Sequence, residues 1–277
     1  MKRSLFERYP LAAQPVQTSA GDQPTPYHVY DGHLMMIGGS ADLDAVSRLL
    51  AGEQIYPAKT ESGRALMAMY VADETEASHG PHTELQFSFY VSHQPTAPVK
   101  DGPFAPVHFL VSDPDARQMC FGLWNDTEKT VAYNREVLGL TPELATSTFA
   151  RQAGQVDFTF HDVEGGALLA SGSIHEAARQ PLNAVGSLFR SFGVRQALAA
   201  ASMKEVAVKV VNPINDLLPR NADAQTISAS DVIITQHFDP ARDKIEIAAD
   251  SVYSQLDFRP TFVQHMRNFK MVYLNPQ

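Results

Sequence analysis

Short apolar segments with the spacing of β-strands recur along almost the whole chain, and this pattern constrains the fold more than any other feature. Residues 65–71 form a nearly continuous apolar run, as expected of a buried strand. Residues 84–91 begin with strict alternation of apolar and polar side chains. Residues 156–160 alternate again, before a Glu-Gly-Gly turn and a hairpin partner at 167–174. Many strands, few helices and no regular alternation of strand with helix predict a closed or strongly curved antiparallel sheet.

The remaining elements follow from the same periodicities. Two helices are predicted at 42–50 and 128–138, with Asp42 and Thr127 as their N-caps. Further strands are predicted at 28–30, 34–37, 107–111, 206–211, 231–238, 244–248 and 267–274.

The chain is expected to comprise an arm and one domain. Residues 1–26 form the N-terminal arm, because its second half is rich in Pro and Gly and poor in large apolar residues. Residues 27–277 form a single domain with a helical insertion near 179–204. The apolar spacing of this insertion fits a helix or helical pair packed over the sheet. A mobile lid or an oligomer contact is the alternative, for which Gly186 and Gly193 would supply flexibility.

Composition and charge narrow the class of partner. The 277 residues carry a formal net charge of −9 with no basic block, which argues against nucleic-acid binding. No run of about 18 apolar residues occurs, and no apolar stretch follows the basic start of the chain, so neither a transmembrane helix nor a signal peptide is expected. The single cysteine, Cys120, excludes a disulfide framework and is interpreted as a buried, unreactive thiol. We therefore expect a soluble cytoplasmic protein with a small-molecule ligand and no nucleic-acid or membrane partner.

Familiar cofactor and nucleophile motifs are missing from the sequence. The segment Gly38-Gly39-Ser40 is too short for a phosphate-binding loop and lacks its lysine, and no Gly-x-Ser-x-Gly elbow occurs. The histidines are numerous, but the pairs His79/His82 and His28/His33 lack the helical spacing of a catalytic zinc site. We therefore expect neither a metal ion nor another cofactor.

The segment Gly80-Pro81-His82-Thr83-Glu84 is the most informative for chemistry, because a turn delivers a carboxylate to the start of an apolar strand. A Glu84 that points inward would lose solvent, its pKa would rise, and it could act as an acid or a base. Alternation places Glu84, Gln86 and Ser88 on one face of the strand and Leu85, Phe87 and Phe89 on the other. We expect the polar face to line a cavity and the aromatic face to pack outward under helices. In the alternative, the aromatic side chains fill the lumen and Glu84 faces water.

A second polar stretch runs from Asn134 to Leu144. Arg135 and Glu136 are adjacent and precede a break at Gly139 and Pro142. An arginine in this setting can orient a carboxylate substrate. The alternative is an ion pair at the end of a helix.

Five short motifs follow one another along the chain. They are Pro26-Tyr27, Asp42-Leu43-Asp44-Ala45, Leu66-Met67-Ala68-Met69, Gly80-Pro81-His82-Thr83-Glu84 and Asn134-Arg135-Glu136. Their order and spacing, from about residue 26 to residue 174, resemble those of the acetoacetate decarboxylase superfamily. The resemblance implies a fold of the α+β class, mainly β: an antiparallel β-barrel or cone with flanking helices that assembles as a homo-oligomer. This agrees with the strand-rich pattern.

The same resemblance implies that the superfamily's reactive lysine is missing. Members decarboxylate β-keto acids through a lysine Schiff base, and a neighbouring lysine lowers the pKa of the reactive amine. Counted from Arg135-Glu136, the two lysine positions fall on Pro142 and Glu143, and no lysine lies between Lys129 and Lys204. The pocket arginine falls near Gly32 and the first pocket glutamate near Ala65, so only the second glutamate carries over, onto Glu84.

These observations leave two main hypotheses about function. In the first, the chain is an enzyme, of lyase or hydrolase type, that acts on a small carbonyl or keto-acid compound by carboxylate and histidine acid–base chemistry. Its expected catalytic residues are then Glu84, Glu136 and His82, and its expected substrate-binding residues are Arg135, Glu143 and Gln86. In the second, it is a non-catalytic member that binds a small ligand. A structural or assembly protein is a third possibility.

Overall fold

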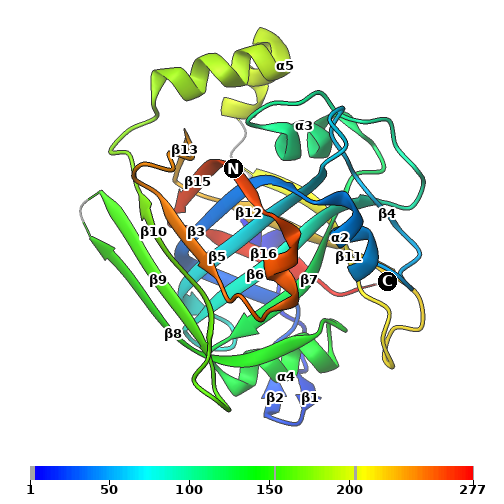
Figure 1. Cartoon of the computed structure of the whole chain (residues 1–277). Coiled ribbons are helices and arrows are strands. Elements are labelled where there is room, and N and C mark those ends of the chain that lie inside the picture. The colour runs from blue at the N-terminus through cyan, green and yellow to red at the C-terminus, as the bar shows by residue number, and fades with distance from the viewer. Residues whose placement is uncertain (1–3, 153, 203–204, 277) are drawn as a thin grey trace.

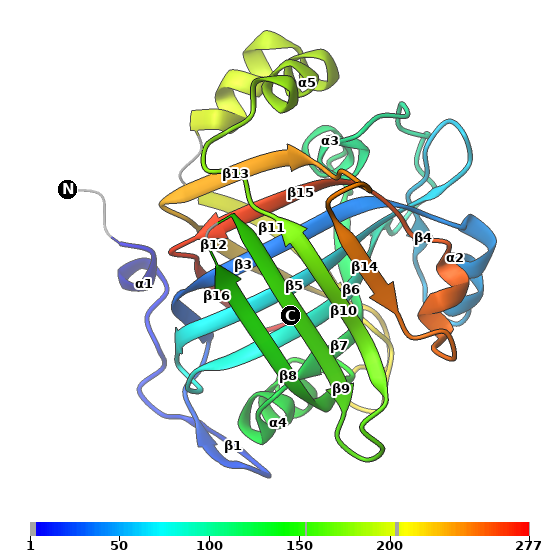
Figure 2. The ribbon, with the colours of Figure 1, turned by 60° about the vertical axis from the view of Figure 1, so that its left-hand side comes forward.

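Seven strands form a ring of hydrogen-bonded neighbours, because the last strand of the chain returns to pair with the first long one. The computed structural model describes residues 4–152, 154–202 and 205–276. We call the seven hydrogen-bonded strands the seven-strand ring (Figures 1 and 2). In order around the ring they are β3 (Tyr27–Ala41), β5 (Ala65–Ala77), β6 (His82–Ser92), β7 (Arg117–Asn125), β11 (Glu205–Asn212), β12 (Ala222–Ala229) and β16 (Lys270–Leu274).

A second layer of strands continues the sheet from β7 and crosses in front of β3 and β5 in the view of Figure 2. The branches of the sheet end at β4, β13 and β14, so the sheet as a whole is not a closed barrel. The strands of this sheet that lie outside the ring are β4 (Tyr56–Pro57), β8 (Pro142–Gln152), β9 (Gln155–Asp162), β10 (Leu168–His175), β13 (Val232–His237), β14 (Lys244–Ile247) and β15 (Arg259–Arg267).

The largest hydrophobic core lies between the ring and this second layer. Apolar side chains on the outer face of β5 and β6 meet those on the inner face of β8, β9 and β10. Leu85, Phe87 and Phe89 belong to this core, and all three are almost fully buried. The aromatic face of β6 therefore packs under a second sheet, and the sequence-based expectation that helices cover it was wrong.

Helices cover the ends and sides of the sheet. α4 lies at one end of the molecule, and α3 lies near the other, where α5 packs against it (Figure 2). α5 is kinked at Gly193, whose φ of 73° is left-handed. None of the described helices is long and apolar enough to cross a membrane. The helices are α1 (Leu5–Arg8), α2 (Leu43–Leu49), α3 (Ala105–Ser112), α4 (Glu128–Glu136), α5 (Leu182–Ser202) and the 3-10 helix η1 (Val252–Leu256).

Several predicted elements are confirmed. α2 and α4 begin where the caps predict, since the side chains of Asp42 and Thr127 accept hydrogen bonds from the backbone of their first turns. The predicted hairpin is β9 and β10. The predicted helical insertion is α5; positions 203 and 204 at its end lie outside the described residues.

The N-terminal segment holds regular structure where an extended arm was expected. After α1, a hairpin of β1 (Val16–Thr18) and β2 (Gly21–Gln23) turns through Ser19 and Ala20. Ser19 binds α4 through Glu136, so the hairpin is attached to the domain. Positions 1–3 of the expected arm lie outside the described residues.

Two strand predictions were wrong. Residues 107–111 belong to the helix α3, because a short apolar run fits either structure and Pro106 suits the first turn of a helix. The two strands predicted on either side of Asp31-Gly32 are one strand, β3, whose pairing with β5 shifts register there. A Cβ on Gly32 would lie 2.6 Å from the carbonyl oxygen of Asp73, so glycine permits this close approach of the strands.

The sheet is mixed rather than purely antiparallel. β7, α4 and β8 form one β-α-β unit, in which β7 and β8 are parallel, and β7 also pairs in parallel with β11. The expectation of no strand–helix alternation therefore fails at this one place. This unit brings the start of β8 beside the end of β7, so that Glu143 lies next to Trp124.

Candidate functional site

The polar face of β6 points to the inside of the seven-strand ring. Gln86 donates a hydrogen bond to Ser88, and Ser88 also accepts one from Gln118 of β7. Tyr70 of β5 in turn donates to Gln118. Since the opposite face of β6 is buried in the core between the layers, Glu84 lies on this inner face with Gln86 and Ser88.

A buried network of hydrogen bonds surrounds Glu84 where β3, β5, β6 and β7 meet. Tyr27 donates to Glu74 and contacts Nε2 of His82 at 2.9 Å. Nε2 of His82 lies 3.1 Å from Oε2 of Glu74, and its Nδ1 lies 2.9 Å from the carbonyl oxygen of Gly80. Nδ2 of Asn125 donates to Oε2 of Glu84 at 3.1 Å. Two carboxylates and one imidazole are thus held together by strand pairing.

The network shifts the pKa of both of its predicted members. Burial lowers the pKa of His82, but Glu74 and the Gly80 carbonyl raise it more, to about 9. Burial raises the pKa of Glu84, and Glu74 raises it further, while Asn125 and His82 lower it; the outcome is about 7. His82 is therefore a cation paired with Glu74 at neutral pH, and Glu84 gains or loses a proton there.

Glu84 keeps some contact with solvent although its neighbours do not. The side chains of His82, Glu74 and Asn125 are buried, whereas Glu84 and Gln86 are half-buried. Glu84 and Gln86 are therefore less enclosed than His82, Glu74 and Asn125. Cys120, on the neighbouring strand, is also half-buried, and burial together with Glu84 raises the pKa of its thiol, which keeps it protonated.

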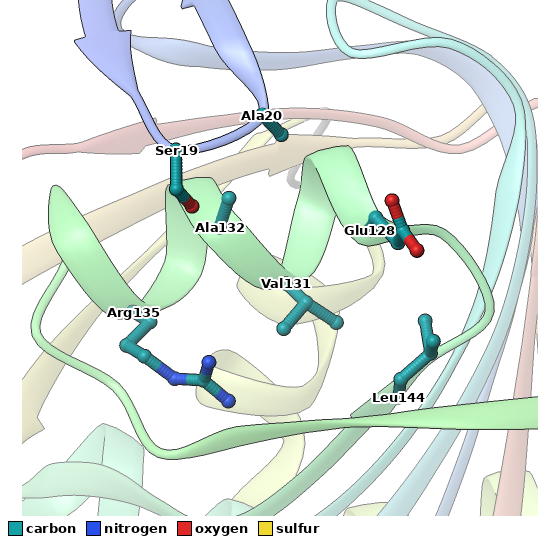
Figure 3. A pocket seen from close by; sticks show the side chains of 7 residues that line it. All are labelled: Ser19, Ala20, Glu128, Val131, Ala132, Arg135 and Leu144. Atoms are coloured by element: carbon teal, nitrogen blue, oxygen red, sulfur yellow. The ribbon is translucent and has the colours of Figure 1, made fainter. Parts of the chain in front are cut away.

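Arg135 and Glu136 do not reach Glu84. Glu136 lies at the surface, where both the backbone N–H and the hydroxyl of Ser19 donate to it and lower the pKa of its carboxyl. Nη2 of Arg135 donates to the carbonyl oxygen of Pro142 at 2.6 Å. Arg135 lines a cavity of about 240 Å³ between α4, the β1–β2 turn and β8 (Figure 3).

Glu143 lies in another cavity, on the opposite side of the sheet from Glu84. Its Oε2 accepts a hydrogen bond of 3.1 Å from Nε1 of Trp124. The cavity has a volume of about 300 Å³ and is lined by Glu53, Phe121, Gly122, Leu123, Trp124, Thr141, Glu143, Pro213, Ile214 and Tyr253. Of the six predicted site residues, the structure thus brings His82, Glu84 and Gln86 to one inner wall and leaves the other three elsewhere.

Sequence reasoning missed Tyr27, Glu74 and Asn125 as members of the network. No local motif links these residues to Glu84 in the sequence, because the network is formed by side chains from four different strands. Strand register held the only signal: Glu74 pairs opposite His82, and Glu84 opposite Asn125. Once β5, β6 and β7 are placed side by side, alternation puts these four side chains on one face.

One further cluster of potential ligand groups occurs among the described residues. His33, Glu176 and His265 are buried, and one ligand atom from each lies within 4.8 Å of the others. However, Arg151 and Arg267 occupy both oxygens of Glu176, at 2.9 and 2.7 Å. Two guanidinium groups at the carboxylate oppose a cation there. Burial and His265 lower the pKa of His33 to about 4, so it is neutral in this cluster.

The architecture described above is the acetoacetate decarboxylase-like fold. Solved structures with this fold include acetoacetate decarboxylase from Legionella pneumophila subsp. pneumophila str. Philadelphia 1, with a TM-score of 0.59 over 100% of this chain and 96% of that one, at 13% identity. The enduracididine biosynthesis enzyme MppR, complexed with pyruvate, gives a TM-score of 0.57 over 96% of this chain and 98% of that one, also at 13% identity. No family model and no curated protein matches the sequence. The likeness therefore concerns the fold.

Proposed function

We propose that this chain is an enzyme that acts on a small carbonyl or keto-acid compound by proton transfer at Glu84, without a lysine Schiff base. One observation carries the proposal. Glu84 has a pKa near 7, keeps accessible surface, and lies on a polar inner wall of the ring. A carboxyl group poised near the working pH is the group that general acid–base catalysis needs.

The chemistry follows from the charges in the network. As a carboxylate, Glu84 removes a proton from the carbon beside a carbonyl group. The C–H electron pair forms a C=C bond, and the π pair of the carbonyl moves to its oxygen, which gives an enolate. The amide of Gln86 lies on the same wall and can donate a hydrogen bond to that oxygen. Return of that proton from Glu84 to another carbon of the conjugated enolate completes an isomerisation. In a dehydration, Glu84 instead gives the proton to a β-hydroxyl group, which leaves as water while the enolate electrons form the new C=C bond. His82 serves as a positioning residue: it pairs with Glu74, and its positive charge lowers the pKa of Glu84.

The alternative is a protein that binds a small ligand without converting it. The closed hydrogen bonding of His82, Glu74 and Tyr27 favours this reading, because a fully satisfied network also serves as a rigid wall. In either case the proposed compartment is the cytoplasm, where the lone Cys120 would remain reduced.

A panel of keto acids and simple carbonyl compounds tests the proposal on the wild-type protein and on Glu84→Gln. We expect at least one compound to raise the melting temperature of the wild type, since a ligand at 100 times its Kd adds about 2.7 kcal/mol of stability. Turnover of that compound should fall by about 10²–10⁴-fold in Glu84→Gln. Glu246→Gln, an exposed strand carboxylate, is the matched control.

The outcomes separate the hypotheses. Binding without turnover in the wild type supports the binding protein. Turnover that survives Glu84→Gln unchanged contradicts the assignment of the site. Borohydride trapping of a covalent adduct on a lysine during turnover would contradict the absence of a Schiff base.

A further inference from the structure

The cavity beside Glu143 is walled by aromatic rings. Tyr253, from η1, stacks on Phe87 with ring centroids 4.7 Å apart and an interplanar angle of 16°. The indole of Trp124 stands across Tyr253 at 5.5 Å and 77°, and Phe121 stands across it at 6.5 Å and 74°. Three of these rings, Phe121, Trp124 and Tyr253, line the cavity directly.

Gly122 makes this arrangement possible. A Cβ at this position would clash with the hydroxyl of Tyr253 and would lie 3.1 Å from the ring of Trp124. Glycine thus lets the phenol ring lie against the backbone of β7. Phe121, Trp124 and Tyr253 therefore pack together as an aromatic wall on one side of the cavity.

The charge of the cavity is negative. Among the described residues, Glu143 and Glu53 are the only charged ones that line it, and none of the lysines, arginines or histidines does. Within the described part of the chain, neither carboxylate forms an ion pair with a basic side chain. Glu53 is fixed by the backbone N–H of Ile214, at 3.0 Å, and by Asn221, at 2.6 Å. The cavity therefore offers two uncompensated carboxylates beside aromatic faces.

We propose that this cavity binds an organic cation that carries a quaternary or highly methylated ammonium group. Aromatic faces attract such a cation through their quadrupoles, and a nearby carboxylate adds charge attraction. A bare metal ion prefers a full shell of oxygen or nitrogen ligands, whereas methyl groups on an ammonium let it pack on ring faces without needing a hydrogen-bond acceptor for each substituent. A volume of about 300 Å³ suits a small ligand.

This site is separate from the one proposed around Glu84. In the pairing of β6 with β7, Trp124 is opposite Leu85 and Asn125 is opposite Glu84, so the two sites lie on opposite faces of the sheet. Binding of a cation at Trp124 can therefore be tested whether or not Glu84 is catalytic.

Trp124 is the only tryptophan of the chain, so its fluorescence reports directly on the cavity. We expect choline and tetramethylammonium to change the emission of the wild-type protein in a saturable way. The neutral isostere 3,3-dimethyl-1-butanol should bind at least about 10-fold more weakly, because it lacks the charge that the rings and carboxylates attract. This comparison needs no variant and so cannot fail through misfolding.

Two variants complete the test. Glu143→Gln should weaken choline binding by about 10-fold, and Tyr253→Leu by about 10–30-fold, while Glu246→Gln should bind as the wild type does. Equal affinity for choline and its neutral isostere would overturn the proposal in favour of a plain apolar cavity. No saturable change in Trp124 emission up to high millimolar choline would overturn it altogether.

Discussion

Replacing His82 by leucine is expected to lower the free energy of unfolding by about 3–5 kcal/mol at pH 6. The imidazolium of His82 is the cationic partner of Glu74, whose side chain is only 2% exposed. Leucine keeps much of the volume but leaves a buried carboxylate with only the hydroxyl of Tyr27. The loss of one partner of a buried pair costs more than the pair contributes as a whole.

The pH dependence of the unfolding free energy shows whether the loss comes from the His82–Glu74 ion pair. The pKa of His82 in the folded protein is about 9, above its ordinary value of 6.5. Its stabilising contribution is therefore complete below pH 6.5 and is lost as the pH rises through about 9. Urea denaturation of the wild type and of His82→Leu at pH 6, 7.5 and 9.5 should show a difference that shrinks with rising pH. His161→Leu is the control, because this imidazole near the end of β9 contacts the carbonyl oxygen of Gly166 and no ion pair with it occurs among the described residues. A loss in His82→Leu no larger than in this control would contradict the ion pair.

Replacing Glu84 by glutamine is expected to stabilise the protein above neutral pH. The folded state raises the pKa of Glu84 from 4.5 to about 7, so the folded protein binds this proton more tightly than the unfolded chain does. The wild type therefore loses stability at this site as the pH rises from 4.5 through about 7. A shift of this size corresponds to about 3 kcal/mol, which the amide of glutamine does not lose.

Denaturation curves at pH 5 and pH 8.5 measure this effect. The advantage of Glu84→Gln over the wild type should increase between the two pH values by about 2–3 kcal/mol. Glu246→Gln, whose carboxylate is exposed, should show no such increase. An advantage that is the same at both pH values would mean that Glu84 is ionised like a surface carboxylate.

The strand pattern of the sequence predicted much of this fold because alternation survives wherever one face of a strand is buried. β6 and the β9–β10 hairpin are the clearest cases, since the alternating apolar residues of these strands join the core between the two layers. α2 and α4 were predicted because capping is local, so Asp42 and Thr127 suffice. α3 was missed because an eight-residue apolar helix under a sheet has no polar face to give it a period.

The candidate site was predicted only in part, for a related reason. Glu84 and His82 were found because one turn presents them together. Glu74 and Tyr27 were missed because they come from other strands, and no local motif predicts the register between strands that are distant in the sequence. The same holds for the aromatic wall of the other cavity, where Trp124 and Tyr253 meet although 128 residues lie between them in the sequence.

The central claim is that Glu84 carries an exchangeable proton near neutral pH inside the ring, and its ionisation can be observed directly. In protein labelled with ¹³C at the glutamate side chains, the carboxyl signal of Glu84 is identified by its absence from Glu84→Gln. We expect its chemical shift to titrate with a midpoint near pH 7. A midpoint near 4.5, the ordinary value for glutamate, would contradict the proposed acid–base site.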